Sequence, residues 1–276
     1  MDGNALAKRV RMDVKKQAAR LDAPPGLAVI IVGHNPASEV YVAHKEKDCA
    51  RCGIVSHTYR LGEEAGQEKL PALIHRLNNQ PDIHGILVQL PLPGGYGAEA
   101  VLQAIAPEKD VDAFHTVTAG KFYLNKGPTF LPCTPAGVME LLDAYAIDPR
   151  GKHAVVVGHS NIVGKPMAMM LLQRDATVTI CHIHTADLAM HTRMADILVC
   201  AVGKAGLITA GMVKPGAVVI DVGINRDGNK ICGDVDFDAV GKIASHITPV
   251  PGGVGPMTRA MLMKNTLEAA KNIATR

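Results

Sequence analysis

Residues 155–171 read VVVGHSNIVGKPMAMML, and the fold expected for the chain follows from this stretch. A strand of valines ends at a turn marked by Gly158, and a helix begins near Gly164. This order can place a pyrophosphate on backbone N–H groups at the helix N-terminus. The spacing departs from G-x-G-x-x-G, because Ser160 stands at the second glycine position and Gly164 comes one residue late. We interpret the stretch as a dinucleotide-binding turn, with a purely structural glycine turn as the alternative.

Further short apolar runs alternate with helical patterns beyond this turn. Runs that are β-branched and apolar throughout are typical of strands buried on both faces of a parallel sheet. The expected strands are residues 153–158, 176–181, 196–202, 217–223 and 245–248. The series therefore predicts a Rossmann-like domain with a doubly wound parallel sheet.

Another α/β series precedes it in the chain. Thr134 and Pro135 fit the N-cap and first position of a helix that ends near Tyr145. Strands are expected near 27–32, 54–60 and 85–89, and helices near 37–52, near 67–79 and at the N-terminus. The fold class is therefore α/β, with two three-layer α/β domains.

The boundary between the two series is expected at IDPRGKH, residues 147–153. We place a first domain at 1–146 and the Rossmann-like domain at 147–255. The last helical pattern, residues 256–276, has no strand after it. We therefore expect it to pack back on the first domain.

The composition points to a small-molecule partner. The 276 residues are 47% hydrophobic with a formal net charge of +3, so the chain can form a core but does not strongly attract nucleic acid or an anionic membrane. Aromatic residues make up 3%, with no Trp, which argues against a stacking surface for single strands. The apolar runs 27–32 and 85–90 are far too short to span a bilayer.

The six cysteines are too sparse in a chain of this length for a disulfide scaffold, which favours a reduced, cytoplasmic setting. Cys49 and Cys52 have the spacing of a redox or metal pair. They lie in a helical pattern without a second pair, so we expect no metal site. The N-terminal stretch lacks the apolar segment of a signal peptide.

The end of the strand expected at 176–181 bears on the choice of cofactor. An acidic residue there bonds the ribose of NAD, but the segment after Cys181 reads HIHT, without an acid. His159, His182 and His184 can donate toward a 2′-phosphate, which favours NADP and leaves NAD possible. The alternative is that they are ordinary surface histidines.

A second candidate site involves Tyr41 and Lys45, which lie four residues apart and share one face of a helix. Gln89 ends an expected strand, at the edge where ligands bind in open α/β sheets. Its amide needs a partner, which Lys45 or a ligand can supply. Asp112 lies in a loop. The alternatives are a solvated lysine beside a half-buried tyrosine, and an aspartate that forms an Asx turn.

Several stretches occur in a characteristic order: SEVYVAHK (38–45), GILVQLPLP (85–93), PEKDVDAFH (107–115), PCTPAGV (132–138), VVVGHSNIVGKPM (155–167), DVGIN (221–225), GDVDF (233–237) and TPVPGGVGPMT (248–258). Together they resemble the bifunctional methylenetetrahydrofolate dehydrogenase/methenyltetrahydrofolate cyclohydrolase family. The resemblance covers nearly the whole chain. It implies two α/β domains with a folate cleft between them, and a homodimer.

The resemblance implies NADP-dependent oxidation of 5,10-methylenetetrahydrofolate to the methenyl form and hydrolysis of that form to 10-formyltetrahydrofolate. It implies that Lys45 is the catalytic lysine, that Gln89 bonds it, and that Tyr41 is its neighbour in the folate site. Asp112 matches the carboxylate that holds the pterin. The implied cofactor contacts are Gly158, His159, Ser160, Ile183 and Ile224, and the implied substrate contacts also include Pro251, Gly252 and Gly253.

The residue types fit this chemistry. A lysine that acts as the base in hydrolysis must be neutral, so its pKa must fall toward neutrality, and both burial and a cationic methenyl group act in that direction. Asp112 can accept two parallel hydrogen bonds from a pterin. Two departures from the family pattern are Ala113, which replaces a glycine that commonly follows the aspartate, and Ile183, which cannot bond a phosphate.

Two other functions remain open on the sequence alone. An enzyme with dehydrogenase activity only can retain Lys45 and Gln89 in a cleft that does not hydrolyse. A non-catalytic, NADP-responsive binding protein would explain the Rossmann-like half, but would leave Lys45, Gln89 and Asp112 without a common role.

Overall fold

The computed structural model describes residues 1–63, 68–126, 130–228 and 230–274. The chain divides into two compact units, each of which contains one main parallel sheet. The three-stranded unit comprises Lys8–Cys133 and Arg259–Arg276, and the five-stranded unit comprises Met1–Ala7 and Thr134–Thr258. The domain limits 1–146 and 147–255 stay a prediction.

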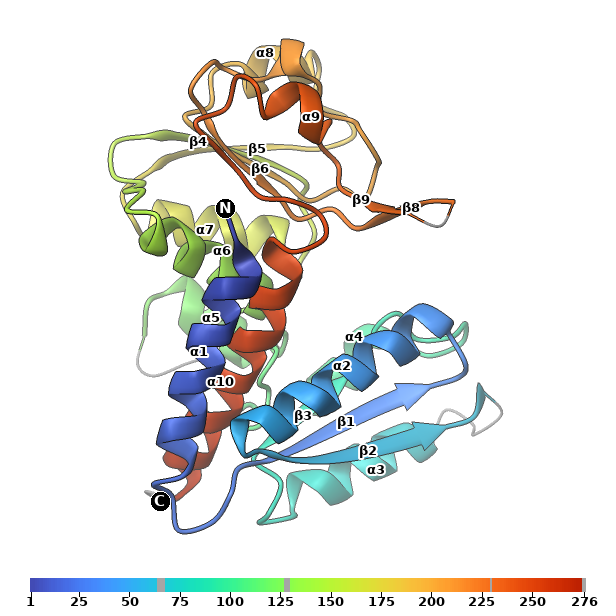
Figure 1. The fold of residues 1–276 in the computed structure, drawn as a ribbon. Helices are drawn as coiled ribbons and strands as arrows, with labels where there is room; N and C mark the ends of the chain where they lie inside the picture. The colour runs from blue at the N-terminus through green and yellow to red at the C-terminus, as the bar shows by residue number, and fades with distance from the viewer. Residues whose placement is uncertain (64–67, 127–129, 229, 275–276) are drawn as a thin grey trace. The chain divides into compact units, whose positions relative to one another are not determined.

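The sheet of the three-stranded unit has the order β2-β1-β3, with all strands parallel. The strands are β1 (Gly26–Val32), β2 (Val55–Leu61) and β3 (Gly85–Val88). Helices α2 (Pro36–Cys52) and α3 (Lys69–Asn78) lie on opposite faces of this sheet (Figure 1). Because both faces are covered, β1 is buried along its whole length.

The core of this unit follows the alternation of side chains along β1. Ala28, Ile30 and Val32 pack on the face covered by Leu70 and Ile74 of α3. Two short helices, α4 (Ala98–Gln103) and α5 (Thr116–Tyr123), complete the unit together with most of α1 (Gly3–Ala18) and α10 (Val254–Ala274). The predicted strands of this series and the helices predicted near 37–52 and 67–79 are confirmed to within two residues, with residue 67 outside the described part. The helix expected at the N-terminus is confirmed as α1, which ends at Ala18.

The five-stranded unit contains a parallel sheet of order β10-β7-β6-β4-β5. Its strands are β4 (His153–Val157), β5 (Thr177–Cys181), β6 (Ile197–Cys200), β7 (Val218–Asp221) and β10 (His246–Ile247). All five expected strands are confirmed. The chain leaves β4 toward β5 on one side and returns to β6 on the other, so the strand order reverses between β4 and β6.

Helices cover both faces of this sheet (Figure 1). α7 (Gly164–Leu172) lies on one face, and α8 (Leu188–Thr192) and α9 (Phe237–Val240) lie on the other, with the short 3-10 helix η2 (Ala210–Met212). An antiparallel hairpin of β8 (Asn225–Asp227) and β9 (Lys230–Cys232) was not expected. Its strands are too short and polar to show alternation, although Asp-Gly at 227–228 is a turn signal.

The N-cap predicted at Thr134 is wrong. Helix α6 runs from Cys133 to Ala144, so Thr134 and Pro135 lie inside it. The Thr134 hydroxyl is instead hydrogen-bonded to that of Thr258, at 2.9 Å. The last helix begins at Val254, earlier than expected, and residues 275–276 lie outside the described part. No helix among the described residues is long and apolar enough to cross a membrane.

Candidate functional site

Helix α2 places a lysine in a row of core positions. Asn35 caps the helix, since its Oδ1 accepts the N–H of Ser38 at 3.1 Å. One stripe of the helix is buried, namely Ser38, Val42, Lys45, Asp48, Cys49 and Cys52. Lys45 is only 9% exposed, at a position where the helical period requires an apolar side chain. Such a conflict between pattern and residue marks a functional position.

Gln89 is the hydrogen-bonding partner of Lys45 in the structure. Lys45 Nζ donates to Gln89 Oε1 at 2.9 Å. The orientation of the amide is fixed, because its Nε2 donates to the carbonyl oxygen of Leu90 at 2.6 Å and the oxygen must then face the lysine. Gln89 directly follows β3, and its N–H bonds the carbonyl oxygen of Ile30 at 2.8 Å. The sheet therefore fixes the position of this acceptor.

Burial lowers the pKa of Lys45 below its ordinary value. The negative charge of Asp112 opposes this shift, and the positive charge of Arg259 adds to it. Burial raises the pKa of the Cys49 thiol to about 12 and that of Cys52 to about 11. Both thiols therefore stay neutral and place no charge beside the lysine. The amine can accordingly lose its proton more easily than an exposed lysine.

Asp112 lies on the loop that follows a bridge between Ile86 and Asp110. Burial raises its pKa, and the charge of Lys45 opposes the rise. The thiol of Cys133 is within hydrogen-bonding reach of this carboxyl group and lies 3.4 Å from the carbonyl oxygen of Val111. The carboxyl group thus has acceptor capacity left for a ligand.

Ala113 adopts the left-handed conformation, with φ of 63°. Alanine at this position therefore adopts a positive φ, a conformation that glycine takes more easily. Asp110 stabilises the turn, because its carboxylate accepts the N–H groups of Phe114 at 3.1 Å and His115 at 2.8 Å. These hydrogen bonds hold the loop that carries Asp112 in one conformation, despite the strain of an alanine with positive φ.

Three residues near this site were missed by sequence reasoning: Arg259, Cys133 and Asn265. Arg259 Nε lies 2.8 Å from the buried carboxylate of Asp48, which fixes the guanidinium. Arg259 also lowers the pKa of Tyr41, against a larger rise caused by burial. Asn265 donates to the carbonyl oxygens of Val111 and Leu131, at 2.8 and 2.9 Å. Only Cys133 lies in a motif that the sequence analysis identified. Arg259 and Asn265 belong to α10, far along the chain from the other residues of this site.

The turn after β4 forms a close backbone cradle. Gly158 has φ of 122°, and a Cβ atom there would overlap the carbonyl oxygen of Ala201. A Cβ atom on Gly164 would overlap the carbonyl oxygen of Gly158. Only glycines at both positions let the N-terminus of α7 approach the turn this closely. Ser160 Oγ accepts the N–H of Val163 at 3.2 Å, and the exposed turn fits a pyrophosphate.

Histidines gather beside this turn. The rings of His159 and His182 lie 5.0 Å apart between centroids, and those of His182 and His184 lie 6.0 Å apart. All three residues are exposed. Ile183 is 88% exposed and Ile224 49% exposed, so both are accessible to a ligand but neither offers a polar group. The structure therefore brings the histidines together as possible phosphate donors.

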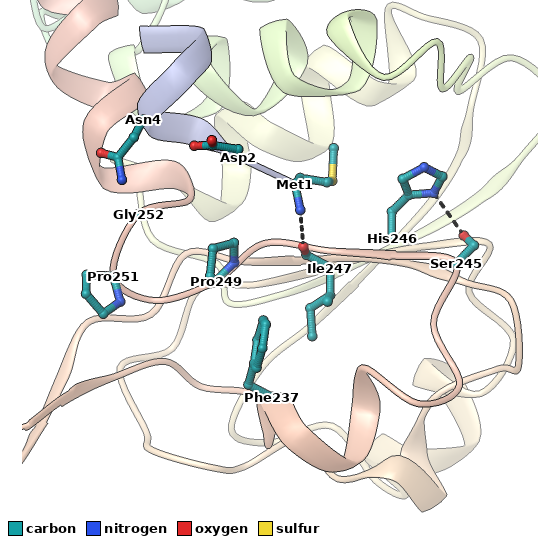
Figure 2. Close-up of a pocket in the computed structure, with 10 residues that line it drawn as sticks. All are labelled: Met1, Asp2, Asn4, Phe237, Ser245, His246, Ile247, Pro249, Pro251 and Gly252. Atoms are coloured by element: carbon teal, nitrogen blue, oxygen red, sulfur yellow. Dashed lines mark hydrogen bonds between the residues drawn. The ribbon is translucent and has the colours of Figure 1, made fainter. Parts of the chain in front are cut away.

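A pocket of about 470 Å³ lies in the five-stranded unit (Figure 2). Pro251 and Gly252 line it. Gly253 is buried and, like Lys45, Gln89 and Asp112, is not among the lining residues. The remaining lining residues are Met1, Asp2, Asn4, Phe237, Ser245, His246, Ile247 and Pro249. Among the residues that the structure describes, no group of three His, Cys, Asp or Glu side chains is placed to hold a metal ion.

Two family models match the chain. Residues 1–112 match the catalytic domain of tetrahydrofolate dehydrogenase/cyclohydrolase, and residues 132–274 match the NAD(P)-binding domain of the same family. A bifunctional protein FolD from Burkholderia ambifaria is 58% identical over 278 aligned positions, which cover 99% of this chain and 97% of the relative.

Solved structures show the same similarity. A bifunctional methylenetetrahydrofolate dehydrogenase/cyclohydrolase from Campylobacter jejuni superimposes with a TM-score of 0.97 at 52% identity, and covers 98% of both chains. A methylenetetrahydrofolate dehydrogenase-cyclohydrolase from Trypanosoma brucei, complexed with NADP cofactor and an inhibitor, gives a TM-score of 0.96 at 40% identity. That comparison covers 100% of this chain and 98% of the other.

Proposed function

The chain belongs to the tetrahydrofolate dehydrogenase/cyclohydrolase family, and from this premise we propose that it oxidises 5,10-methylenetetrahydrofolate with NADP and hydrolyses the methenyl product to 10-formyltetrahydrofolate. The observation that carries the proposal is the hydrogen bond of 2.9 Å between the buried Lys45 and Gln89. Oxidation alone needs no base, so a buried amine with a lowered pKa indicates the hydrolytic step as well.

Lys45 acts as the base in hydrolysis. Its neutral amine donates one N–H to Gln89 Oε1, which leaves the nitrogen lone pair free to take a proton from water. The water oxygen then bonds to the cationic methenyl carbon. The bond from that carbon to N5 breaks, the hydroxyl proton of the adduct passes to N5, and the formyl group stays on N10, while the proton taken by Lys45 is released to solvent. Gln89 orients the amine without the negative charge that would restore its positive form.

Asp112 and Tyr41 hold the folate in this proposal. Asp112 accepts two parallel hydrogen bonds from the pterin, which fix the ring in one orientation. Tyr41 lies one helical turn from Lys45 on α2, so its ring extends the same binding surface. Pro251, Gly252 and Gly253 belong to the substrate wall by their match to the family motif.

NADP, when bound, supplies the hydride acceptor. Gly158 and Ser160 form the cradle for its pyrophosphate, and His159 donates toward the 2′-phosphate. Ile183 and Ile224 provide apolar contact beside the cofactor. The absence of an acid after β5 supports NADP over NAD, as does the NADP complex of the Trypanosoma brucei relative.

We also propose that the protein acts as a homodimer in the cytoplasm. All six cysteines lack disulfide partners, which suits a reducing compartment. Sedimentation velocity tests the assembly, because a dimer has twice the monomer mass of 29.2 kDa.

Absorbance of the methenyl compound separates the three candidate functions. We expect it to form only when NADP⁺ is present and then to decay, since oxidation produces it and hydrolysis removes it. Accumulation without decay would indicate dehydrogenase activity only, and no change would indicate a binding protein without catalysis. Methenyl compound supplied directly should decay without NADP⁺.

A further inference from the structure

Two buried carboxylates lie at the carboxyl end of the five-stranded sheet. Asp221 is the last residue of β7 and is 3% exposed, and Asp234 is 0% exposed. No Lys, Arg or His side chain within the described ranges forms an ion pair with either one. Burial of a carboxylate without a cation is costly, so backbone N–H groups must compensate for it.

Asp234 binds three consecutive N–H groups of the loop after β6. Its Oδ2 accepts the N–H groups of Val202 at 2.7 Å and Gly203 at 3.1 Å. Its Oδ1 accepts the N–H of Lys204 at 2.8 Å and the side-chain amide of Asn225 at 2.9 Å. Together these four hydrogen bonds fix the conformation of an otherwise exposed loop.

Asp221 in turn holds Asp234. Its carboxylate accepts the N–H groups of Asp234 at 2.9 Å and Val235 at 3.0 Å, and that of Gly223 at 3.0 Å. A Cβ atom on Gly223 would overlap the carboxylate of Asp234, and one on Gly233 would overlap that of Asp221. The two carboxylates and the two glycines therefore fit one another closely.

The loop that Asp234 fixes borders the point where the strand order reverses. That point lies between β4 and β6, and ligands of doubly wound sheets bind there, outside the carboxyl ends of the strands. One wall is the turn at Gly158, and the other is the loop 201–204. The turn and the loop begin side by side, because Gly158 and Ala201 directly follow the paired strands β4 and β6, and a Cβ atom on Gly158 would overlap the carbonyl oxygen of Ala201.

We propose that Asp234, held by Asp221, is a positioning residue for the nicotinamide cofactor, because it fixes the loop 202–204 as one wall of the cofactor crevice. This inference rests on the proposed use of NADP at this end of the sheet. Burial raises the pKa of Asp221 to about 6, against the effect of the N–H groups it accepts. Burial of the pair therefore has a cost in stability, which fits a role in positioning rather than in stabilisation.

The test is the affinity for NADP⁺ measured by titration calorimetry on the full chain. Asp234→Asn replaces one acceptor oxygen by an NH₂ group that faces N–H groups, so the loop loses its anchor. We expect the Kd for NADP⁺ to rise on the order of tenfold or more. Decay of supplied methenyl compound, which consumes no cofactor, shows on the same sample that the three-stranded unit is folded, and far-UV circular dichroism with Tm shows whether the five-stranded unit is folded.

Asp196→Asn is the matched control. Asp196 precedes β6 at the opposite end of the strand, where its carboxylate accepts from Lys214 at 2.7 Å and from the N–H of His153 at 2.9 Å. We expect this variant to lower Tm and leave the Kd for NADP⁺ unchanged. The inference is overturned if Asp234→Asn binds NADP⁺ as the wild type does, or if both variants weaken binding equally at equal loss of Tm.

Asn225→Ala keeps the inference testable should Asp234→Asn fail to fold. It removes one of the four hydrogen bonds to the Asp234 carboxylate and leaves the three backbone bonds. We expect a rise in Kd of about threefold, and wild-type affinity in this variant would contradict the inference. A wild-type chain that does not bind NADP⁺ at all would instead reject the proposed function.

Discussion

Lys45 and His159 both contribute a nitrogen to a candidate site, yet their surroundings differ. Lys45 lies in the buried stripe of α2 and its pKa is lowered by burial, whereas His159 lies on an exposed turn beside two other exposed histidines. The difference follows from the proposed task. A base must lose its charge, which burial favours, while a donor to a phosphate must remain accessible and keep its hydrogen.

This difference predicts the size of mutational effects. A buried group with a shifted pKa has no substitute nearby, so its loss should abolish one activity. The hydrogen bonds of an exposed group can be replaced by neighbouring side chains or by water, so its loss should change ligand affinity only modestly.

The largest effect is expected from Lys45→Met. Without the base, the rate of hydrolysis of the methenyl compound should fall about 10²–10⁴-fold, measured as the decay of its absorbance. Lys47→Met is the matched control, because Lys47 is exposed on the same helix and should be dispensable. Full hydrolytic activity in Lys45→Met would refute the role of this residue as the base.

The same variant tests the burial argument through stability. A lowered pKa means that folded Lys45 holds its proton less tightly than the unfolded chain does, so wild-type stability should rise with pH from the folded pKa up to about 10.5. Lys45→Met should lack this rise. Near neutral pH its free energy of unfolding should equal that of the wild type or exceed it by up to about 1 kcal/mol. Urea unfolding across pH measures both.

A smaller effect is expected from Asp112→Asn. The amide can accept one hydrogen bond where the carboxylate accepts two, so the Kd for a folate ligand should rise about 10- to 100-fold. Fluorescence titration measures it, with Glu108→Gln as the control on the same loop, since Glu108 is exposed. Unchanged folate affinity in Asp112→Asn would show that Asp112 does not hydrogen-bond the pterin.

A graded effect is expected from His159→Arg. A guanidinium is always charged and can bond a phosphate through two N–H groups, so the affinity for NADP⁺ should increase about three- to tenfold while that for NAD⁺ stays the same. His75→Arg, on helix α3 of the three-stranded unit, should change neither affinity. An equal gain for both cofactors would show that His159 does not face the 2′-phosphate.

The two regions also differ in how far the sequence predicted them. The strands of both sheets were readable because their runs are apolar and short, and Gly158, Tyr41, Lys45 and Gln89 stood out at strand ends or one helical turn apart. Arg259 and Asn265 did not, because α10 brings them to the site from far along the chain. No local pattern records such a contact, and the same holds for the bonds of Asp234 to the loop 202–204.

The smallest effect is expected from Ala113→Gly, which tests whether the loop that carries Asp112 depends on strain. Glycine relieves the cost of φ of 63°, about 1–2 kcal/mol for a residue with a Cβ atom. It also loses a buried methyl group and gains freedom in the unfolded chain, which together cost about the same. The free energy of unfolding should therefore change by less than about 1 kcal/mol, with folate affinity unchanged.

Asn125→Gly measures the backbone effect of a glycine at positive φ without the loss of a buried methyl group. Asn125 also has positive φ, 51°, but is exposed, and asparagine tolerates this conformation. Urea unfolding should show no loss beyond the small entropic cost of glycine. A much larger change in Ala113→Gly, accompanied by weaker folate binding, would mean that the alanine itself holds Asp112 in place, and that the buried site depends on packing of the loop as well as on charge.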